Sequence, residues 1–179
     1  RETRVAQGHN SAYVSEDGEI YMVYHSRFAE GKNGITEAHE VRVQQLFVNE
    51  AGWLVAAPYE YTGEHISKTG YDMEQMCGEY EFIIHTPTTY YQKAGKATVG
   101  IMQPSHITLN KDGSVTGELT GSWTYEEGSP NMTITLDGIT YQGVFLKMPS
   151  EKLYFNQKQR EVVMTFTVLG NNVTAWGSK

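Results

Sequence analysis

Six histidines are the residues that would most directly support metal or acid–base chemistry in this chain. They are His9, His25, His39, His65, His85 and His106. None of them belongs to a His-Glu-x-x-His pair or a His-x-His cluster, the spacings that bring two imidazoles onto one metal ion. The sequence also contains no Gly-x-Ser-x-Gly elbow and no glycine-rich phosphate loop. Because these spacings are absent, the sequence does not indicate a zinc hydrolase.

Carboxylates are the second group that could carry chemistry, because glycoside hydrolysis needs two of them at a defined separation across a sugar. Six acidic residues flank predicted strands: Glu40, Glu50, Glu60, Asp72, Glu79 and Glu81. Spacing along the chain does not show their separation in space. Each is therefore interpreted first as a solvated charge at the end of a strand.

Aromatic side chains are the third group, since they stack on sugar rings as readily as they fill a core. The chain has three tryptophans, Trp53, Trp123 and Trp176, and 12 tyrosines. Packing in the core or at an edge is the simpler interpretation for each of them. Tyr90 and Tyr91 follow Pro87 in an irregular stretch and form the pair that we first expect to be exposed.

Composition restricts the class of partner. The net charge of −7 argues against nucleic acid, which requires concentrated Lys and Arg, and is compatible with a neutral polysaccharide. No apolar run approaches the roughly 20 residues of a membrane-spanning helix. Cys77 is the only cysteine, so neither an internal disulfide nor a thiolate metal cluster can form. A buried structural thiol is the preferred interpretation.

Turn residues divide residues 8–61 into four apolar runs. Asp17-Gly18 separates the first two, because Asp-Gly readily supplies the positive φ angles of a tight hairpin. A polar loop that starts at Gly31 follows the second run, and residues 49–52 turn the third run into the fourth. The pattern predicts a four-stranded antiparallel meander, which is the size of one β-propeller blade.

The remaining chain has turn signals that separate short runs rich in β-branched and aromatic residues. These runs occupy residues 79–85, 98–103, 106–110, 114–119, 122–125, 132–136, 140–148, 162–169 and 173–176. With almost no helical periodicity, they predict a closed all-β barrel or a sandwich, with an irregular or helical insert at residues 150–159. We place the domain boundary after residue 63, so that residues 1–63 form the blade and residues 64–179 form the barrel. Gly100, Gly117 and Gly143 lie inside strands and are expected to mark bulges or bends.

The blade stretch also carries a family resemblance. It contains Gly8-His9-Asn10-Ser11, then YMVYHSRF at residues 21–28, HEVRV at 39–43 and NEAGWLVAAPY at 49–59, in that order. These motifs closely resemble the last blade of the five-bladed propeller in glycoside hydrolase family 43 arabinan endo-1,5-α-L-arabinanases. The following segment resembles, more loosely, their C-terminal β-barrel, through Gly78-x-Tyr80-x-Phe82, Gly121-x-Trp123 and the motif at residues 141–145.

The resemblance implies an activity whose catalytic groups lie elsewhere. The family hydrolyses α-1,5-linked arabinofuranose chains with inversion, using a general base, a general acid and a third carboxylate that tunes the acid. All three come from earlier blades, so none is assigned to this chain, and Glu40 and Glu50 are not nominated in their place. The segment alone is expected to be inactive. Its implied partners are arabinan or arabino-oligosaccharides and the remaining propeller blades, in the same polypeptide or in a companion chain.

His9 is the one site residue that the resemblance implies. In the family, the histidine of the Gly-His-Asn-Ser motif reaches the central channel and binds a metal ion, usually calcium, with a shell made mostly of water. Asn10 and Ser11 are expected to line the same channel. His25 and His39 are expected to pack within the blade.

Three interpretations remain open. The first is the C-terminal part of a secreted or periplasmic arabinan-degrading hydrolase, whose targeting peptide, if any, lies upstream of Arg1. The second is a non-catalytic carbohydrate-binding module formed mainly by residues 64–179. The third, a lipocalin-like carrier of a small apolar ligand, follows from the barrel shape alone and requires an empty interior.

Overall fold

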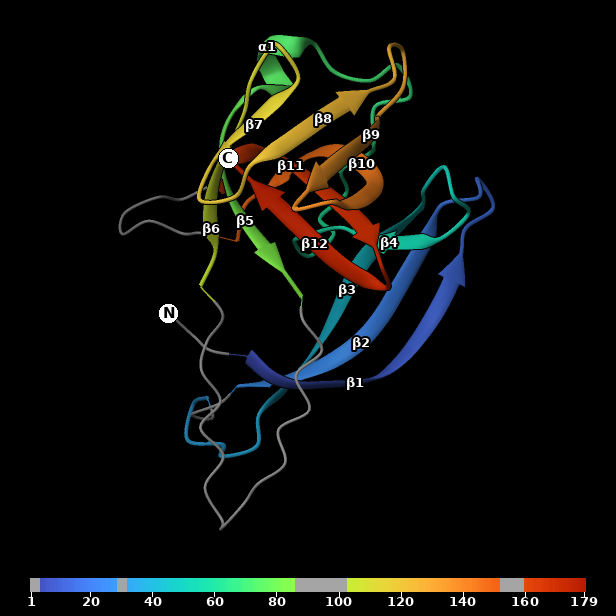
Figure 1. Ribbon diagram of the computed structural model, residues 1–179. Helices are drawn as coiled ribbons and strands as arrows, with labels where there is room; N and C mark the ends of the chain where they lie inside the picture. Colours follow the sequence, from blue (N-terminus) through green and yellow to red (C-terminus); the bar gives the residue numbers. More distant parts are fainter. Residues whose placement is uncertain (1–3, 29–31, 86–102, 152–159) are drawn as a thin grey trace.

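The computed structural model describes residues 4–28, 32–85, 103–151 and 160–179 of the chain, with the backbone alone for residues 4–6. It consists of an open four-stranded sheet and a closed eight-stranded barrel (Figure 1). The described residues form one short helix, α1 (Met73–Met76). The all-β fold predicted from the sequence is confirmed.

The sheet is a meander in which each strand pairs antiparallel with the next. Its strands are β1 (Arg4–Val14), β2 (Ile20–Phe28), β3 (His39–Val48) and β4 (Leu54–Ala56). The chain continues along β3 beyond β4, because the amide of Ala57 donates to the carbonyl of Gln45 at 2.9 Å and that of Tyr61 donates to Val43 at 2.8 Å. The predicted four-stranded meander is therefore confirmed.

The same Asp-Gly dipeptide makes two different turns. After β1, the amide of Gly18 donates to the carbonyl of Ser15 at 3.0 Å, and only Gly18 of the pair has a positive φ, 81°. This hairpin is a type I turn followed by a glycine bulge, so Gly18 has the expected positive φ and Asp17 does not. Asp137 and Gly138 have φ values of 49° and 80°, as a two-residue type I′ turn requires.

The barrel closes in the order β10-β11-β12-β5-β6-β7-β8-β9. Its strands are β5 (Gly78–Ile84), β6 (Ser105–Leu109), β7 (Ser114–Gly117), β8 (Gly121–Tyr125), β9 (Asn131–Leu136), β10 (Ile139–Pro149), β11 (Val162–Gly170) and β12 (Val173–Ser178). Each lies within two residues of a run predicted from the sequence.

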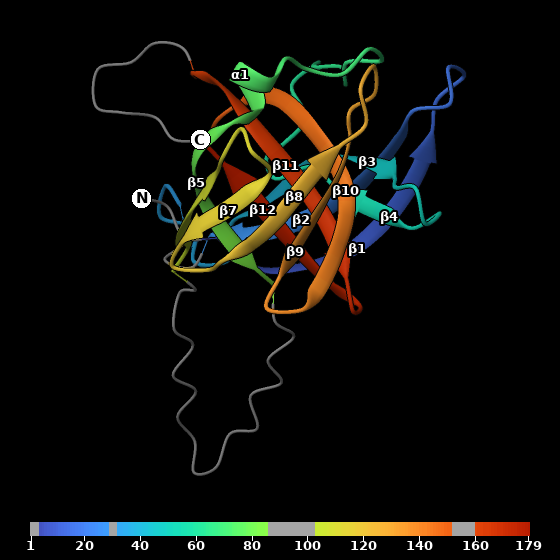
Figure 2. The same cartoon turned by 45° about the horizontal axis from the view of Figure 1, so that its top comes forward.

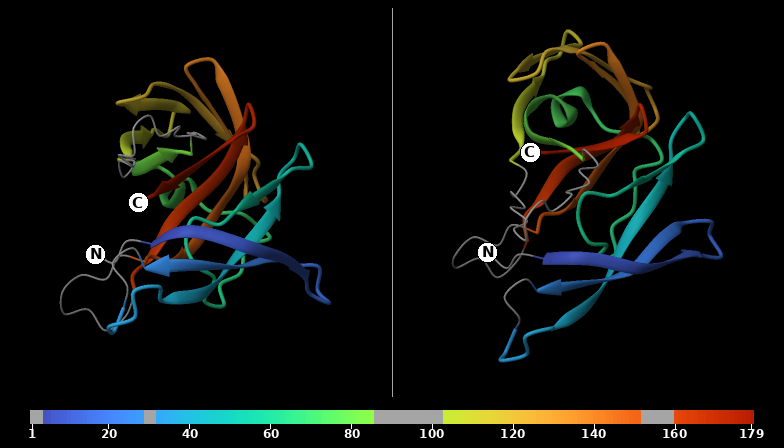
Figure 3. Two further views of the ribbon diagram at one scale, coloured as in Figure 1. Left: turned by 90° about the horizontal axis from the view of Figure 1, so that it is seen from below. Right: turned by 60° about the horizontal axis from the view of Figure 1, so that its bottom comes forward.

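The barrel interior is filled by its own side chains. Alternate residues of every strand point inward, among them the large aromatic residues Tyr80, Phe82, Phe145 and Phe166, which are fully buried. The helix α1 lies at one end of the barrel (Figure 3), and Tyr80 donates a hydrogen bond to the carbonyl of Met76 at 2.6 Å. A filled interior leaves no room for a carried ligand, so the third interpretation is excluded.

Strand β10 is buried on both faces. Phe145 points into the barrel, whereas Val144, Leu146 and Met148 point outward and pack against the sheet. Figure 2 shows the sheet along the side of the barrel that contains β10 and β11. Burial on both faces explains why residues 144–146 are continuously apolar, without the alternation of a strand with one wet face.

Two of the glycines expected at special positions have the conformation or the contacts that require glycine. Gly117 has a φ of 119°, which is rare for residues with a side chain. At Gly143, a β-carbon would lie 1.8 Å from the carbonyl oxygen of Thr167 on β11, so only glycine fits. Gly100, the Tyr90-Tyr91 pair and most of the predicted segments at 98–103 and 150–159 lie outside the described residues.

Candidate functional site

His9 lies on an irregular part of β1. The pairing of β1 with β2 shifts register on both sides of Gly8, and His9 itself has a positive φ of 48°, which few non-glycine residues adopt. The irregularity leaves the His9 side chain exposed. Its ring lies 5.3 Å from that of His25, measured between centroids.

Three histidines from adjacent strands therefore follow one another across the sheet. The His25 ring contacts His9 on one side and His39 on the other, where the centroids are 5.2 Å apart and the rings meet edge to face. His25 is half-buried and His39 is exposed. The two rings therefore pack against each other within the sheet, although His39 remains exposed.

A metal ion at His9 would take few ligands from this part of the chain. Among the described residues, no group of three or more His, Cys, Asp or Glu side chains is placed to hold a metal. Calcium prefers oxygen ligands, so an imidazole on an exposed ring suits only a shell completed by water or by other parts of an enzyme. With its exposed ring, His9 would suit such a shell as one ligand.

The carboxylates singled out in the sequence lie in different places and not in one cluster. Glu50, Asp72 and Glu79 are exposed, as expected for charges at strand ends. Glu40 and Glu60 are half-buried and both pair with Arg42.

Arg42 is the centre of a buried ion-pair cluster that the sequence did not reveal. Its side chain is only 6% exposed and contacts Glu40 at 3.2 Å, Glu60 at 3.5 Å and Glu151. Burial alone would lower the pKa of Arg42, but the charges of Glu151, Glu40 and Glu60 more than offset it, so the pKa is raised and the side chain remains charged. An arginine in an apolar strand, between Val41 and Val43, was the only local signal.

The Arg42 cluster joins the sheet to the end of the barrel. Glu151 follows β10, and its carboxylate also accepts a hydrogen bond from the amide of Glu60 at 3.0 Å. One carboxylate therefore holds two parts of the sheet region, which makes the cluster a structural link between the two β structures.

Further contacts at the same junction are apolar or neutral. Phe47, Val55 and Ala57 of the sheet region pack on the outward face of β10. The side-chain amide of Asn49 donates to the carbonyl of Gln142 at 3.1 Å, and the hydroxyl of Tyr59 donates to Ser178 at 2.9 Å. The sheet and the barrel therefore pack together where β3, β4 and the segment that follows them meet the barrel.

The aromatic candidates are divided between core and surface. Trp123 is buried in the barrel and donates from its indole nitrogen to the carbonyl of Asn110 at 2.8 Å, so it is a core residue. Trp176 is half-buried against His85. Trp53, in the β3–β4 turn, is exposed and is the tryptophan available for a ligand.

Cys77 has the structural environment expected from the sequence. It follows α1, is half-buried, and its thiol contacts the sulfur of Met73 at 3.3 Å. Burial raises the pKa of the thiol, which keeps it protonated and unreactive.

Comparison with known proteins identifies the barrel. The C-terminal lipocalin-like domain of glycoside hydrolase family 43 matches residues 58–177, which include all eight barrel strands in the described residues. The chain belongs to this family. No helix in the described residues is long and apolar enough to cross a membrane.

Curated relatives extend the similarity to the sheet. The chain is 40% identical over 178 residues to the extracellular endo-α-(1→5)-L-arabinanase 2 of Bacillus subtilis, covering 98% of this chain and 33% of that protein. It is 38% identical over 177 residues to the extracellular endo-α-(1→5)-L-arabinanase of Thermotoga petrophila, covering 97% of this chain and 33% of that protein. The chain thus spans about a third of the length of these relatives.

Solved structures show the same arrangement. A family 43 glycoside hydrolase, the YxiA protein of Bacillus licheniformis, superposes with a TM-score of 0.77 at 34% identity, covering all of this chain and 36% of that one. The endo-1,5-α-L-arabinanase of Thermotoga petrophila superposes with a TM-score of 0.75 at 37% identity, covering 98% of this chain and 36% of that one. Because both matches span nearly the whole chain, the sheet and the barrel occur together in these relatives.

Proposed function

We propose that this chain is the C-terminal part of a glycoside hydrolase that degrades arabinan by cleaving α-1,5-L-arabinofuranosidic bonds with inversion. The observation that carries the proposal is the alignment of nearly the whole chain with about one third of two endo-arabinanases. Those two relatives are described as extracellular, which supports a secreted or periplasmic protein.

The open sheet supports its assignment as the last blade of a propeller. Within the described residues, strand β1 is an edge that pairs only with β2, and Tyr13, Val14 and Val41 are exposed apolar residues of the sheet. An unpaired edge and exposed apolar side chains favour association with neighbouring strands. The remaining blades would cover these surfaces and would supply the three catalytic carboxylates.

His9 is proposed as the contribution of this chain to the centre of the enzyme. With its exposed ring on the irregular part of β1, it would provide one ligand to a calcium ion in the propeller channel. The ion would supply a positive charge that keeps nearby carboxylates ionised and fixes their positions.

Hydrolysis of debranched arabinan tests the proposed division of roles. The purified 179-residue chain is expected to release no arabino-oligosaccharides, whereas the enzyme that also contains the other blades releases them with inverted anomeric configuration, as followed by NMR. Release by residues 1–179 alone would show that the catalytic groups lie in this chain and would overturn the proposal.

Replacement of His9 tests the metal assignment. In the intact enzyme, His9→Ala is expected to lower calcium content, to reduce thermal stability modestly and to reduce activity more strongly, because the proposed effect of the ion is electrostatic. His106→Ala, at an exposed histidine of the barrel, is the matched control and should change none of the three. Unchanged calcium content in His9→Ala would rule out His9 as a ligand.

A further inference from the structure

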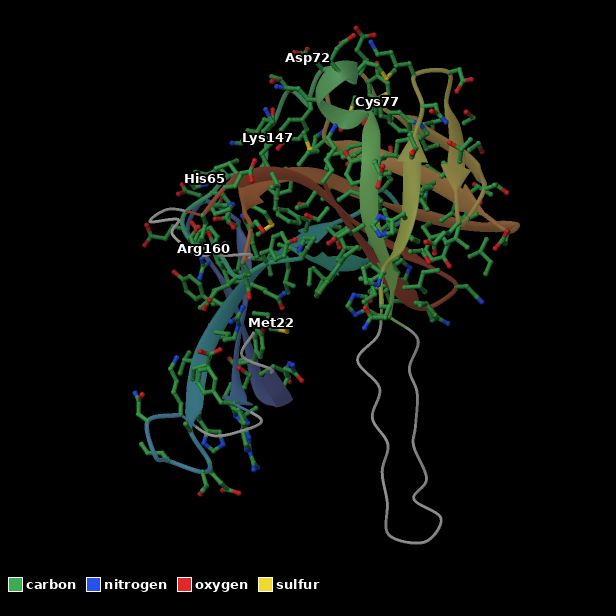
Figure 4. The ribbon with its side chains drawn as sticks, turned by 90° about the vertical axis from the view of Figure 1, so that its left-hand side faces the viewer. Met22, His65, Asp72, Cys77, Lys147 and Arg160 are labelled. Atoms are coloured by element: carbon green, nitrogen blue, oxygen red, sulfur yellow. The ribbon has the colours of Figure 1, made fainter. Side chains whose placement is uncertain are left out.

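A groove runs along the junction between the sheet and the barrel, away from His9. Its walls come from the β1–β2 turn, from β3, from the connector at residues 65–68 and from the start of β9. Figure 4 shows His65 of this connector near the junction, whereas Asp72 and Cys77 lie at the far end of the barrel. The groove has a volume of about 610 Å³, which is within the range of small-ligand sites in proteins, about 300 to 1,000 Å³.

Gln45 places an unsatisfied side-chain acceptor in the wall of the groove. Its side chain is part of the lining although the residue is only 2% exposed. The side-chain nitrogen Nε2 donates to Glu19 at 3.5 Å, but the buried side-chain oxygen Oε1 has no hydrogen-bond partner among the described residues. Leaving a buried acceptor unpaired costs about 1 to 3 kcal/mol, so an incoming hydroxyl donor would be stabilised there.

Glu19 is a second acceptor, and it is held in position. One carboxylate oxygen lies 3.0 Å from Nδ1 of His65, and the other accepts a hydrogen bond from the hydroxyl of Tyr21 at 2.7 Å. The hydrogen bonds from His65 and Tyr21 lower the pKa of Glu19, which therefore stays ionised at neutral pH. The Tyr21 ring is in turn packed edge to face on Tyr61, with centroids 4.8 Å apart.

The groove continues beyond these residues. Asn131 lines both the main groove and a second hollow of about 190 Å³ between Glu50 of the sheet and Thr124 and Thr133 of the barrel. The side-chain amide of Asn131 donates to Glu126 at 3.0 Å, which orients its carbonyl oxygen. Two hollows that share a residue favour an elongated ligand over a compact one.

The charges along the groove restrict the chemistry of that ligand. Asp17, Glu19, Glu50 and Glu126 line it, against a single lysine, Lys68. This excess of negative charge disfavours an acidic polymer. A neutral chain rich in hydroxyl groups suits the site, because its hydroxyls would donate to Gln45 and Glu19 while its C–H faces would rest on the apolar lining at Val48 and Ile66.

We propose that this junction groove binds a neutral oligosaccharide. The choice of an arabino-oligosaccharide as the ligand rests on the proposed function. The sheet supplies much of the lining, so the groove differs from a binding module formed by residues 64–179 alone. Binding in the groove would add to the affinity of the enzyme for the polymer.

Titration of the 179-residue chain with linear α-1,5-arabinohexaose, followed by two-dimensional NMR of the amides, tests the proposal. We expect saturable shifts centred on Gln45, Lys68 and Asn131. Polygalacturonate, an acidic polymer, should produce none. Absence of saturable shifts with arabinohexaose, or shifts caused by polygalacturonate at these residues, would overturn the proposal.

Gln45→Met is the decisive variant, because it retains the approximate shape of the side chain and removes the unpaired side-chain oxygen. Loss of one hydrogen bond predicts an affinity lower by about threefold to tenfold, with no loss of thermal stability. Lys68→Ala, at an exposed position, should also weaken binding, whereas Lys111→Ala, at an exposed lysine on another part of the barrel, should not. Unchanged affinity in both Gln45→Met and Lys68→Ala would contradict the site.

The binding test is independent of the hydrolysis test. Binding without arabinan hydrolysis by the intact enzyme would retain the groove and refute the proposed function. Hydrolysis without binding by the chain would retain the function and refute the groove.

Discussion

The barrel and the sheet are built from the same kinds of residue but are stabilised in different ways. The barrel has no free edge, and its interior is filled by side chains such as Tyr80, Phe145 and Phe166. The sheet has a free edge at β1 and exposed apolar residues, and it is held to the barrel by a small apolar cluster and by the buried Arg42 cluster.

This difference indicates which part depends on its surroundings. A closed and filled barrel satisfies its own backbone hydrogen bonds and buries its own apolar side chains. The sheet satisfies only part of these requirements and therefore depends on the barrel on one side and, as proposed, on further blades elsewhere. The predictions below test this asymmetry.

The largest effect is expected from Arg42→Ala, which should open the sheet and leave the barrel folded. The change leaves Glu40, Glu60 and Glu151 without their cation, and since these carboxylates are partly solvated we expect a loss of about 2 to 3 kcal/mol, below the full cost of breaking a buried pair. Hydrogen exchange would show reduced protection at Val43 and Gln45 and unchanged protection at Val168.

The matched control for this prediction is Arg27→Ala. Arg27 pairs with Glu37 at 3.3 Å on the surface, where such pairs contribute at most about 1 kcal/mol. Equal loss of protection in β3 and β11 of Arg42→Ala would contradict the comparison, because it would mean that the sheet and the barrel unfold as one unit.

A smaller effect is expected from mild acidification, and it should affect the barrel. Burial against Trp176 lowers the pKa of His85, and its Nε2 atom has no partner among the described residues. The unfolded chain therefore binds a proton at higher pH than the folded chain, so stability decreases as pH falls below about 6.5 and levels off below the folded pKa. Thermal unfolding between pH 7 and pH 5 would measure this decrease.

Two variants identify the group responsible for the pH dependence. His85→Gln should flatten the dependence of the melting temperature on pH, whereas His106→Gln, at an exposed histidine of the same barrel, should leave the dependence as it is. If His85→Gln retains the full pH dependence, another group is responsible.

The smallest effect in the isolated chain is expected from Val41→Thr. Val41 is 72% exposed on the sheet, so the free energy of unfolding should change by less than about 0.5 kcal/mol. If neighbouring blades cover Val41 in the intact enzyme, the same change buries a hydroxyl there and should cost about 1 kcal/mol or more. Val162→Thr, 63% exposed on the barrel, should be neutral in both contexts. If Val41→Thr changes the free energy of unfolding equally little in the isolated chain and in the intact enzyme, the proposed blade would be contradicted.

Local patterns were sufficient to predict most of the fold. The predicted runs at residues 132–136 and 140–148 correctly placed β9 and β10, because the turn signal between them and their β-branched and aromatic content depend on residues close in sequence. The Asp17-Gly18 turn was placed correctly, but only Gly18 has the expected positive φ, because the bulge depends on hydrogen bonds between Ser15 and Glu19 as well as on the dipeptide.

The sites were harder to predict because they depend on distant residues. Arg42 and Glu151 are 109 residues apart, and nothing local to either one identifies the other. The groove likewise combines Gln45, His65 and Asn131 from three separate segments. His9 came from a family motif, and the structure adds only that its side chain is accessible.

The double burial of β10 has a consequence for how the chain finds its pairing. In a strand with one wet face, a slip of one residue exchanges apolar for polar side chains, and this cost fixes the register. In β10 both faces are apolar around residues 144–146, so hydrophobicity distinguishes poorly between the two alignments. Steric exclusion provides the distinction, because a slip would bring a residue with a side chain to the position of Gly143, where the carbonyl oxygen of Thr167 leaves no space for a β-carbon. Gly143 therefore fixes the register of β10 against β11, and with it the side of the strand on which each large side chain lies.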